Sequence, residues 1–116
     1  MTRVMLDSNA IDAVLKYGDV DRIRAAGIAV AITTAQEDEI HQIAGAAKRQ
    51  ALFDLLYVLQ ARRIAPADLP WDAGADAVIA ATAAQTCDLL VSDDKSIAHE
   101  NLRVLTYSEF RKEYLP

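Results

Sequence analysis

Four short apolar runs, separated by longer helix-like stretches, constrain the fold of this chain more than any other feature. They lie at residues 3–6, 28–33, 88–92 and 102–106. The runs are apolar at successive positions, which is typical of strands buried on both faces of a parallel sheet. Helical stretches between them supply the crossovers that parallel strands require. We therefore expect an α/β fold in a single domain over residues 1–116, with a central parallel sheet of about four to five strands flanked by helices.

The intervening stretches predict helices whose bounds follow from capping residues and apolar periodicity. We expect helices over residues 9–17, 19–27, 34–46, 48–63 and 72–85, and a last one after residue 106. Thr34 with Glu37, and Thr106 with Glu109, fit the spacing of a capping box. The fourth of these helices is clearly amphipathic, because four leucines recur on one face: Leu52, Leu55, Leu56 and Leu59.

Composition places limits on the compartment and on the partners. The chain has one cysteine, so no disulfide can form within it, and a reducing compartment is expected. Its apolar stretches fall short of the ~18 residues that span a bilayer, and no signal-peptide pattern follows Arg3. We expect a soluble, cytoplasmic protein with no membrane partner. The net charge of -5 is unusual for a nucleic-acid binder, although four acids in a metal site would account for most of it.

Two of the apolar runs end on acids. Asp7 follows the first run, and Asp94 lies just beyond residues 88–92. The carboxyl ends of parallel strands form the functional edge of such sheets, so both acids are expected at one site. A simpler interpretation remains open for each position: Asp7 or Ser8 caps the following helix, and one acid of the Asp93–Asp94 pair caps its turn.

Two further acids lie in expected helices. Asp76 interrupts the otherwise apolar stretch "GADAVIAATA", and a carboxylate buried there would need a partner. Asp72 is the simpler helix cap. Glu39 lies in "TTAQEDEI", where Glu37 is assigned to the capping box and Asp38 suits the helix dipole. Most helix glutamates are solvated, and this interpretation also stays open for Glu39.

Taken together and in order, four segments resemble the PIN domain family, and within it the VapC-like toxin group. The segments are "MLDSNAID", "TTAQEDEI", "DAVIAATA" and "LLVSDDKSI", and the resemblance extends from Val4 to the last expected strand and helix. Asp93 falls on a variable position of the family pattern, and Gln36 stands where many members have threonine. The family acids match one position each: Asp7, Glu39, Asp76 and Asp94.

The resemblance implies a metal-dependent endoribonuclease that hydrolyses RNA phosphodiester bonds, as the toxin of a VapBC-type toxin–antitoxin pair. It implies one or two Mg²⁺ or Mn²⁺ ions held by Asp7, Asp76 and Asp94, with Glu39 as a ligand or as the residue that orients the attacking water. The residues that would support the ligands or contact the substrate are Ser8, Asn9, Ser92 and Asp93. The implied partners are RNA, an antitoxin and a second copy of the chain, with exposed apolar surface on the helix at 48–63 available for a protein contact.

Two alternatives remain. One is a non-catalytic PIN-like module that binds RNA or protein, and the other is a nuclease acting on DNA or flap structures. Four retained acids favour the enzyme, because a scaffold without a metal has little reason to keep carboxylates that repel one another. Relatives that act on DNA usually carry larger insertions, which this chain lacks.

Overall fold

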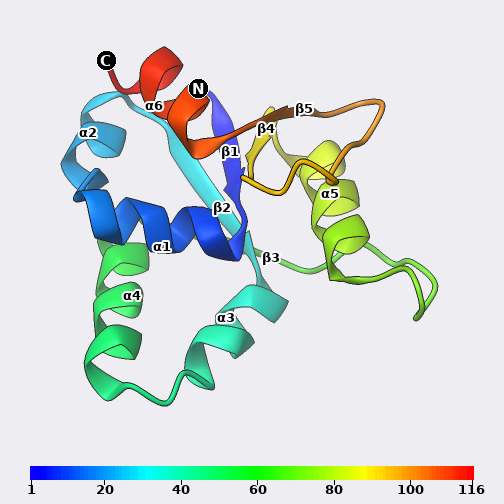
Figure 1. Ribbon diagram of the computed structural model, residues 1–116, viewed down its shortest axis with the longest axis horizontal. Coiled ribbons are helices and arrows are strands. Elements are labelled where there is room, and N and C mark those ends of the chain that lie inside the picture. Colours follow the sequence, from blue (N-terminus) through cyan, green and yellow to red (C-terminus); the bar gives the residue numbers. More distant parts are fainter.

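The computed structural model describes all residues from 1 to 116 and contains one five-stranded sheet (Figure 1). The strands are β1 (Arg3–Leu6), β2 (Ala29–Thr33), β3 (Arg62–Ile64), β4 (Leu89–Val91) and β5 (Arg103–Leu105). Their order in the sheet is β3-β2-β1-β4-β5, and every neighbouring pair is parallel. The predicted α/β fold with a central parallel sheet is confirmed.

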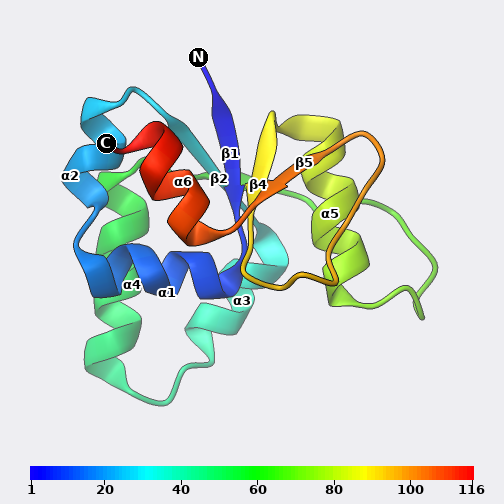
Figure 2. The ribbon, with the colours of Figure 1, turned by 45° about the horizontal axis from the view of Figure 1, so that its top comes forward.

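Helices cover both faces of this sheet. They are α1 (Ser8–Tyr17), α2 (Val20–Ala25), α3 (Thr34–His41), α4 (Ala46–Val58), α5 (Ala75–Thr86) and α6 (Tyr107–Tyr114). One face is covered by α1, α2, α4 and α6, whereas α5 lies alone on the other face (Figures 1 and 2). None of these helices is long and apolar enough to cross a bilayer.

The two faces of the sheet have cores of different composition, as the alternation of side chains along each strand requires. Val4 and Leu6 of β1 belong to the larger core, which also holds Phe110 and the leucines of α4. Met5 belongs to the smaller core, where α5 contributes Ala80 and Ala83. α5 packs on this face of the sheet through these small side chains.

Two predicted helices were too long. The helix expected over residues 34–46 ends at His41, and residues 42–45 form the connection to α4. The helix expected over 48–63 begins at Ala46 and ends at Val58, and β3 follows it. The chain turns at Gln60, whose φ of 52° is the left-handed conformation that usually ends a helix.

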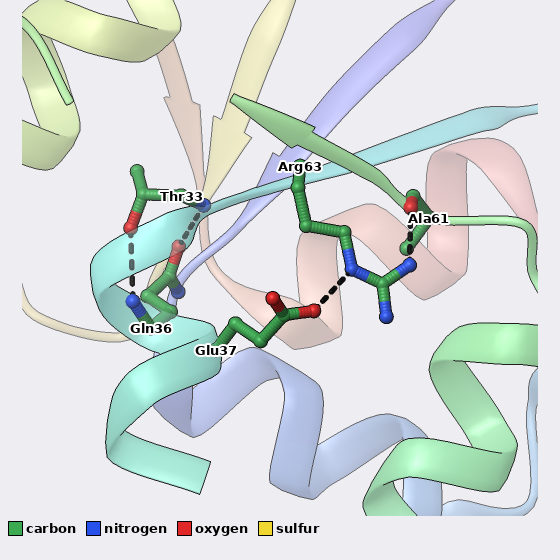
Figure 3. A network of polar contacts seen from close by, with 5 residues as sticks. All are labelled: Thr33, Gln36, Glu37, Ala61 and Arg63. Atoms are coloured by element: carbon green, nitrogen blue, oxygen red, sulfur yellow. Dashed lines mark hydrogen bonds and ion pairs between the residues drawn. The ribbon is translucent and has the colours of Figure 1, made fainter. Parts of the chain in front are cut away.

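The capping box of α3 lies one residue earlier than predicted. Thr33 is the cap: its side chain accepts a hydrogen bond from the Gln36 backbone N at 3.1 Å, and the Gln36 side chain accepts one from the Thr33 backbone N at 2.8 Å (Figure 3). Thr33 has the extended backbone of the last residue of β2, as a cap requires, so Thr34 already lies inside the helix. The predicted capping box of Thr106 and Glu109 is confirmed in α6.

Candidate metal site at the carboxyl edge of the sheet

The order of strands reverses between β1 and β4, at the centre of the sheet. Open α/β sheets bind ligands at such a switch point, outside the carboxyl ends of the strands. Leu6 and Val91, the last residues of these two strands, are paired with each other. The Asp7 backbone N then donates a hydrogen bond to the Val91 carbonyl oxygen at 3.2 Å. The turns that carry Asp7 and Asp94 therefore begin side by side.

Asp7 is a helix cap as well as a candidate ligand. Its Oδ1 accepts a hydrogen bond from the Ala10 backbone N at 2.7 Å, and its side chain is 6% exposed. The simpler interpretation of this position, a cap for α1, is thus confirmed. The other carboxylate oxygen forms no hydrogen bond within the chain, so capping leaves one oxygen available to a ligand.

Asp94 is fixed by two serines. Its backbone N donates to the buried Ser92 Oγ at 3.1 Å, and its Oδ1 accepts from the Ser96 Oγ at 2.6 Å and from the Ser96 backbone N at 2.9 Å. These hydrogen bonds from Ser96 are the main reason why the pKa of Asp94 lies below its usual value. Ser96 was not predicted from the sequence, although the spacing Asp-x-Ser is that of an Asx turn.

Asp76 occupies the first turn of α5, where it is exposed rather than buried in the apolar face of the helix. Its pKa is raised by partial loss of solvent, then by a hydrogen bond with Asp94, and then by repulsion from Asp94 and Asp7. Neighbouring carboxylates disfavour each other's ionised form in this way. Asp76 and Asp94 are therefore neighbours, and Asp7 is near enough for its charge to act on Asp76.

Glu39 lies beside this group and is linked to it through a serine. Its Oε2 accepts a hydrogen bond from the Ser8 Oγ at 3.2 Å, and Ser8 follows Asp7 directly. Both residues line a hollow of about 160 Å³ whose wall includes Ile40 and Leu52. Glu37, in contrast, forms an ion pair with Arg63 at 2.5 Å (Figure 3), rather than the predicted capping contact.

Gln36 holds the carboxyl ends of two strands together. It is 2% exposed, and its Nε2 donates to the Leu6 carbonyl oxygen at 2.8 Å, while its Oε1 accepts from Thr33 (Figure 3). The amide thereby connects the end of β1, which carries Asp7, to the start of α3, which carries Glu39. From the sequence, Gln36 was notable only because many members of the resembled family have threonine at this position.

The remaining predicted residues differ in their contacts. Asp93 accepts a hydrogen bond from the Tyr107 backbone N at 2.8 Å, so it anchors the start of α6. Asn9 is exposed and its side chain forms no hydrogen bond within the chain. The two adjacent acids therefore have separate tasks: Asp93 holds α6, and Asp94 interacts with Asp76.

The donor set suits a hard cation, although its members do not converge. Carboxylate oxygens are the preferred ligands of Mg²⁺ and Mn²⁺. No three acid or histidine side chains are arranged at the spacing of metal ligands. The acids are thus close enough to affect one another's ionisation without surrounding a common point. Comparison with family models, curated proteins and solved structures found no match to this chain.

Proposed function

We propose that this chain is a PIN-like, metal-dependent endoribonuclease of the VapC-like toxin group. The observation that supports the proposal best is the interaction of Asp76 and Asp94 beside Asp7 at the switch point of an all-parallel sheet. Carboxylates that repel one another lower stability unless they serve a ligand, and a divalent cation is the ligand that their oxygens suit. The order of the four segments along the sequence adds to this support.

In this proposal Asp7, Asp76 and Asp94 would hold one or two Mg²⁺ or Mn²⁺ ions. A bound ion supplies a water of lowered pKa and polarises the phosphodiester. Asp7 offers its uncapped oxygen, and Asp94 is kept in place by Ser92 and Ser96. Rigid support of this kind is what a metal site on strand ends requires.

The other residues of the site act on the substrate side in this proposal. Glu39 would orient the attacking water, and the hydrogen bond from Ser8 would fix its carboxylate. Asn9 is exposed at the first turn of α1, where its amide can donate to a phosphate oxygen of the RNA. Asp93 acts indirectly, because it anchors α6 next to the turn of Asp94.

The partners belong to the same proposal. A toxin of this group acts in the cytoplasm and is held inactive by an antitoxin, often as a homodimer. The apolar surface expected on α4 is present, because Tyr57 is 81% exposed and Val58 is 41% exposed. Such surface supports a contact with a protein, either the antitoxin or a second copy.

A non-catalytic RNA- or protein-binding module is the second candidate. The observation that favours it is the position of Glu39, which interacts with Ser8 and with none of the three other acids. A protein that binds without catalysis would tolerate the separation of Glu39 from the three other acids.

Calorimetric titration with Mn²⁺, beside an RNA cleavage assay on the same samples, tests the proposal. We expect the unmodified chain to bind Mn²⁺ and cleave RNA, and Asp94→Asn to lose both. Asp72→Asn is the matched control, because it removes an exposed acid near α5 that has no contact with the site. Unchanged cleavage in both Asp7→Asn and Asp94→Asn would contradict the site. Absence of both Mn²⁺ binding and cleavage in the unmodified chain would favour the binding module.

A further inference from the structure

A hollow of about 350 Å³ lies at the amino end of the sheet, opposite the acids. Its wall includes Arg3 at the start of β1, Arg24 of α2 and Arg62 of β3. No acid lines it. The remaining wall is largely apolar, from Ile28 and Val30 of the β2 region and from Val58 and Leu59 at the end of α4.

Two of these arginines have no counterion, in a chain where 17 acids outnumber 12 lysines and arginines. The arginines elsewhere either pair with an acid or donate to a backbone carbonyl oxygen. Arg24 and Arg62 form no ion pair and no side-chain hydrogen bond. Arg3 donates to the Thr86 carbonyl oxygen at 3.1 Å through one Nη, and its other donors stay free. Arg24 and Arg62 therefore bring positive charge to the hollow without an ion pair in the chain, whereas Arg3 lies beside Asp88, whose Oδ2 accepts a hydrogen bond from the Arg3 backbone N at 2.7 Å.

The turn that closes one side of this hollow has an unusual backbone. Gln60 lies between α4 and β3, lines the hollow, and is the only residue other than glycine with a positive φ, at 52°. This left-handed conformation ends α4 and sets the direction of the turn into β3. The turn places an amide group, which can donate and accept hydrogen bonds, in the same wall as the arginines.

We propose that this hollow binds a nucleotide through its phosphate. Guanidinium groups match phosphate oxygens with paired donors, and the apolar wall suits a ribose or a base. A volume of about 350 Å³ is within the usual range for small-ligand sites. The nucleotide is either free or the end of an RNA strand. Binding of a free nucleotide would be independent of the proposed nuclease function. Binding of an RNA end rests on the proposed nuclease function and would give the enzyme a contact with its substrate remote from the acids.

Nuclear magnetic resonance titration of the full chain in EDTA tests this site, because no cleavage can then occur. The probes are uridine monophosphate and a short 5′-phosphorylated oligouridylate. We expect the backbone amides of residues 27–30 and 59–62 to shift on binding. The variant Arg24→Gln/Arg62→Gln should lower the affinity about tenfold or more, because it removes both unpaired guanidinium groups.

A matched control separates local contacts from overall charge. Arg103→Gln/Lys112→Gln removes the same charge from β5 and α6 and should leave the affinity unchanged. Binding of the mononucleotide at the hollow would identify a free nucleotide as the source, and binding of the oligonucleotide alone would identify an RNA strand. Absence of shifts at the hollow with both probes, or equal losses in both variants, would overturn the site. Since the acids are tested separately by Mn²⁺ binding, failure here is distinguishable from failure of the proposed nuclease.

Discussion

Gln36 is the residue whose removal should affect the architecture of the candidate site most. Gln36→Ala leaves the buried Leu6 carbonyl and the Thr33 backbone N–H without their partners. We expect the free energy of unfolding to fall by about 2–6 kcal/mol, because each of the two buried groups left unpaired costs roughly 1–3 kcal/mol. Urea unfolding measures this loss.

A second capping box provides the control for that measurement. Glu109 holds the same position in α6 as Gln36 holds in α3, and its carboxylate is exposed to water. Glu109→Ala should cost clearly less, since water can replace the lost contact. Equal losses in the two variants would show that the contact of Gln36 with β1 contributes nothing beyond capping.

Asp76 should lower the stability of the metal-free protein at neutral pH. Its pKa is raised in the folded state, so the unfolded chain releases this proton first and the folded state loses stability as the pH rises above about 4. Asp76→Asn cannot ionise and keeps a donor for Asp94. We expect its melting temperature in EDTA to exceed that of the unmodified chain at about pH 7, and the difference to vanish at about pH 3. A lower melting temperature for Asp76→Asn than for the unmodified chain at about pH 7 would contradict the expected repulsion between Asp76 and its neighbouring acids.

At the scale of elements, α6 is tied to the turn between α1 and α2 by a buried polar cluster. Asp19 is 1% exposed, accepts a hydrogen bond from the Tyr107 hydroxyl at 2.6 Å, and pairs with Arg111 at 2.9 Å. Tyr107→Phe should lower the free energy of unfolding by about 1–3 kcal/mol, because it leaves a buried carboxylate short of a donor. Denaturant unfolding at neutral pH measures this effect.

The same variant should change the response to alkali. Burial, the hydrogen bond to Asp19 and the charge of Asp19 raise the pKa of Tyr107 above its ordinary value near 10. Above that pH the unfolded chain ionises while the folded state does not, so the unmodified chain loses stability as the pH rises. Tyr107→Phe should lose less between about pH 8 and about pH 11. Tyr57→Phe, at an exposed position, should behave as the unmodified chain does.

The strands that the sequence predicted are those whose apolar side chains fill both cores. β3 was missed because its sequence, Arg-Arg-Ile, has no such pattern: it is an edge strand with two exposed arginines, identified by its pairing with β2. The positions of Asp7 and of the Asp93–Asp94 pair at the carboxyl edge were predictable for a local reason, since each follows an apolar run, whereas Asp94 was distinguished from Asp93 only by the family resemblance. The contacts of Gln36 with β1 and of Asp93 with α6 join segments far apart in the sequence, and no local pattern indicates them.

Over the whole molecule, charge is divided between the two ends of the sheet. The candidate metal ligands lie at the carboxyl ends of the strands, and the unpaired arginines lie at the amino ends. With a net charge of -5, the chain as a whole repels a polyanion, so any RNA that binds without metal must do so through local contacts. If only a few phosphates are contacted, the affinity for RNA depends only weakly on the salt concentration.

The affinity for an oligouridylate in EDTA should therefore depend only weakly on salt. Each phosphate neutralised on a single strand contributes a slope of about -0.7 to the plot of log affinity against log salt, so two phosphates contacted by Arg24 and Arg62 give about -1.4. Arg24→Gln/Arg62→Gln should reduce the magnitude of the slope by about 1.4, whereas Arg103→Gln/Lys112→Gln should leave it unchanged. Fluorescence anisotropy with a labelled RNA measures both. A slope that the first variant does not alter, or a steeper slope that both variants reduce equally, would mean that RNA binds through the diffuse field of the surface rather than at the hollow.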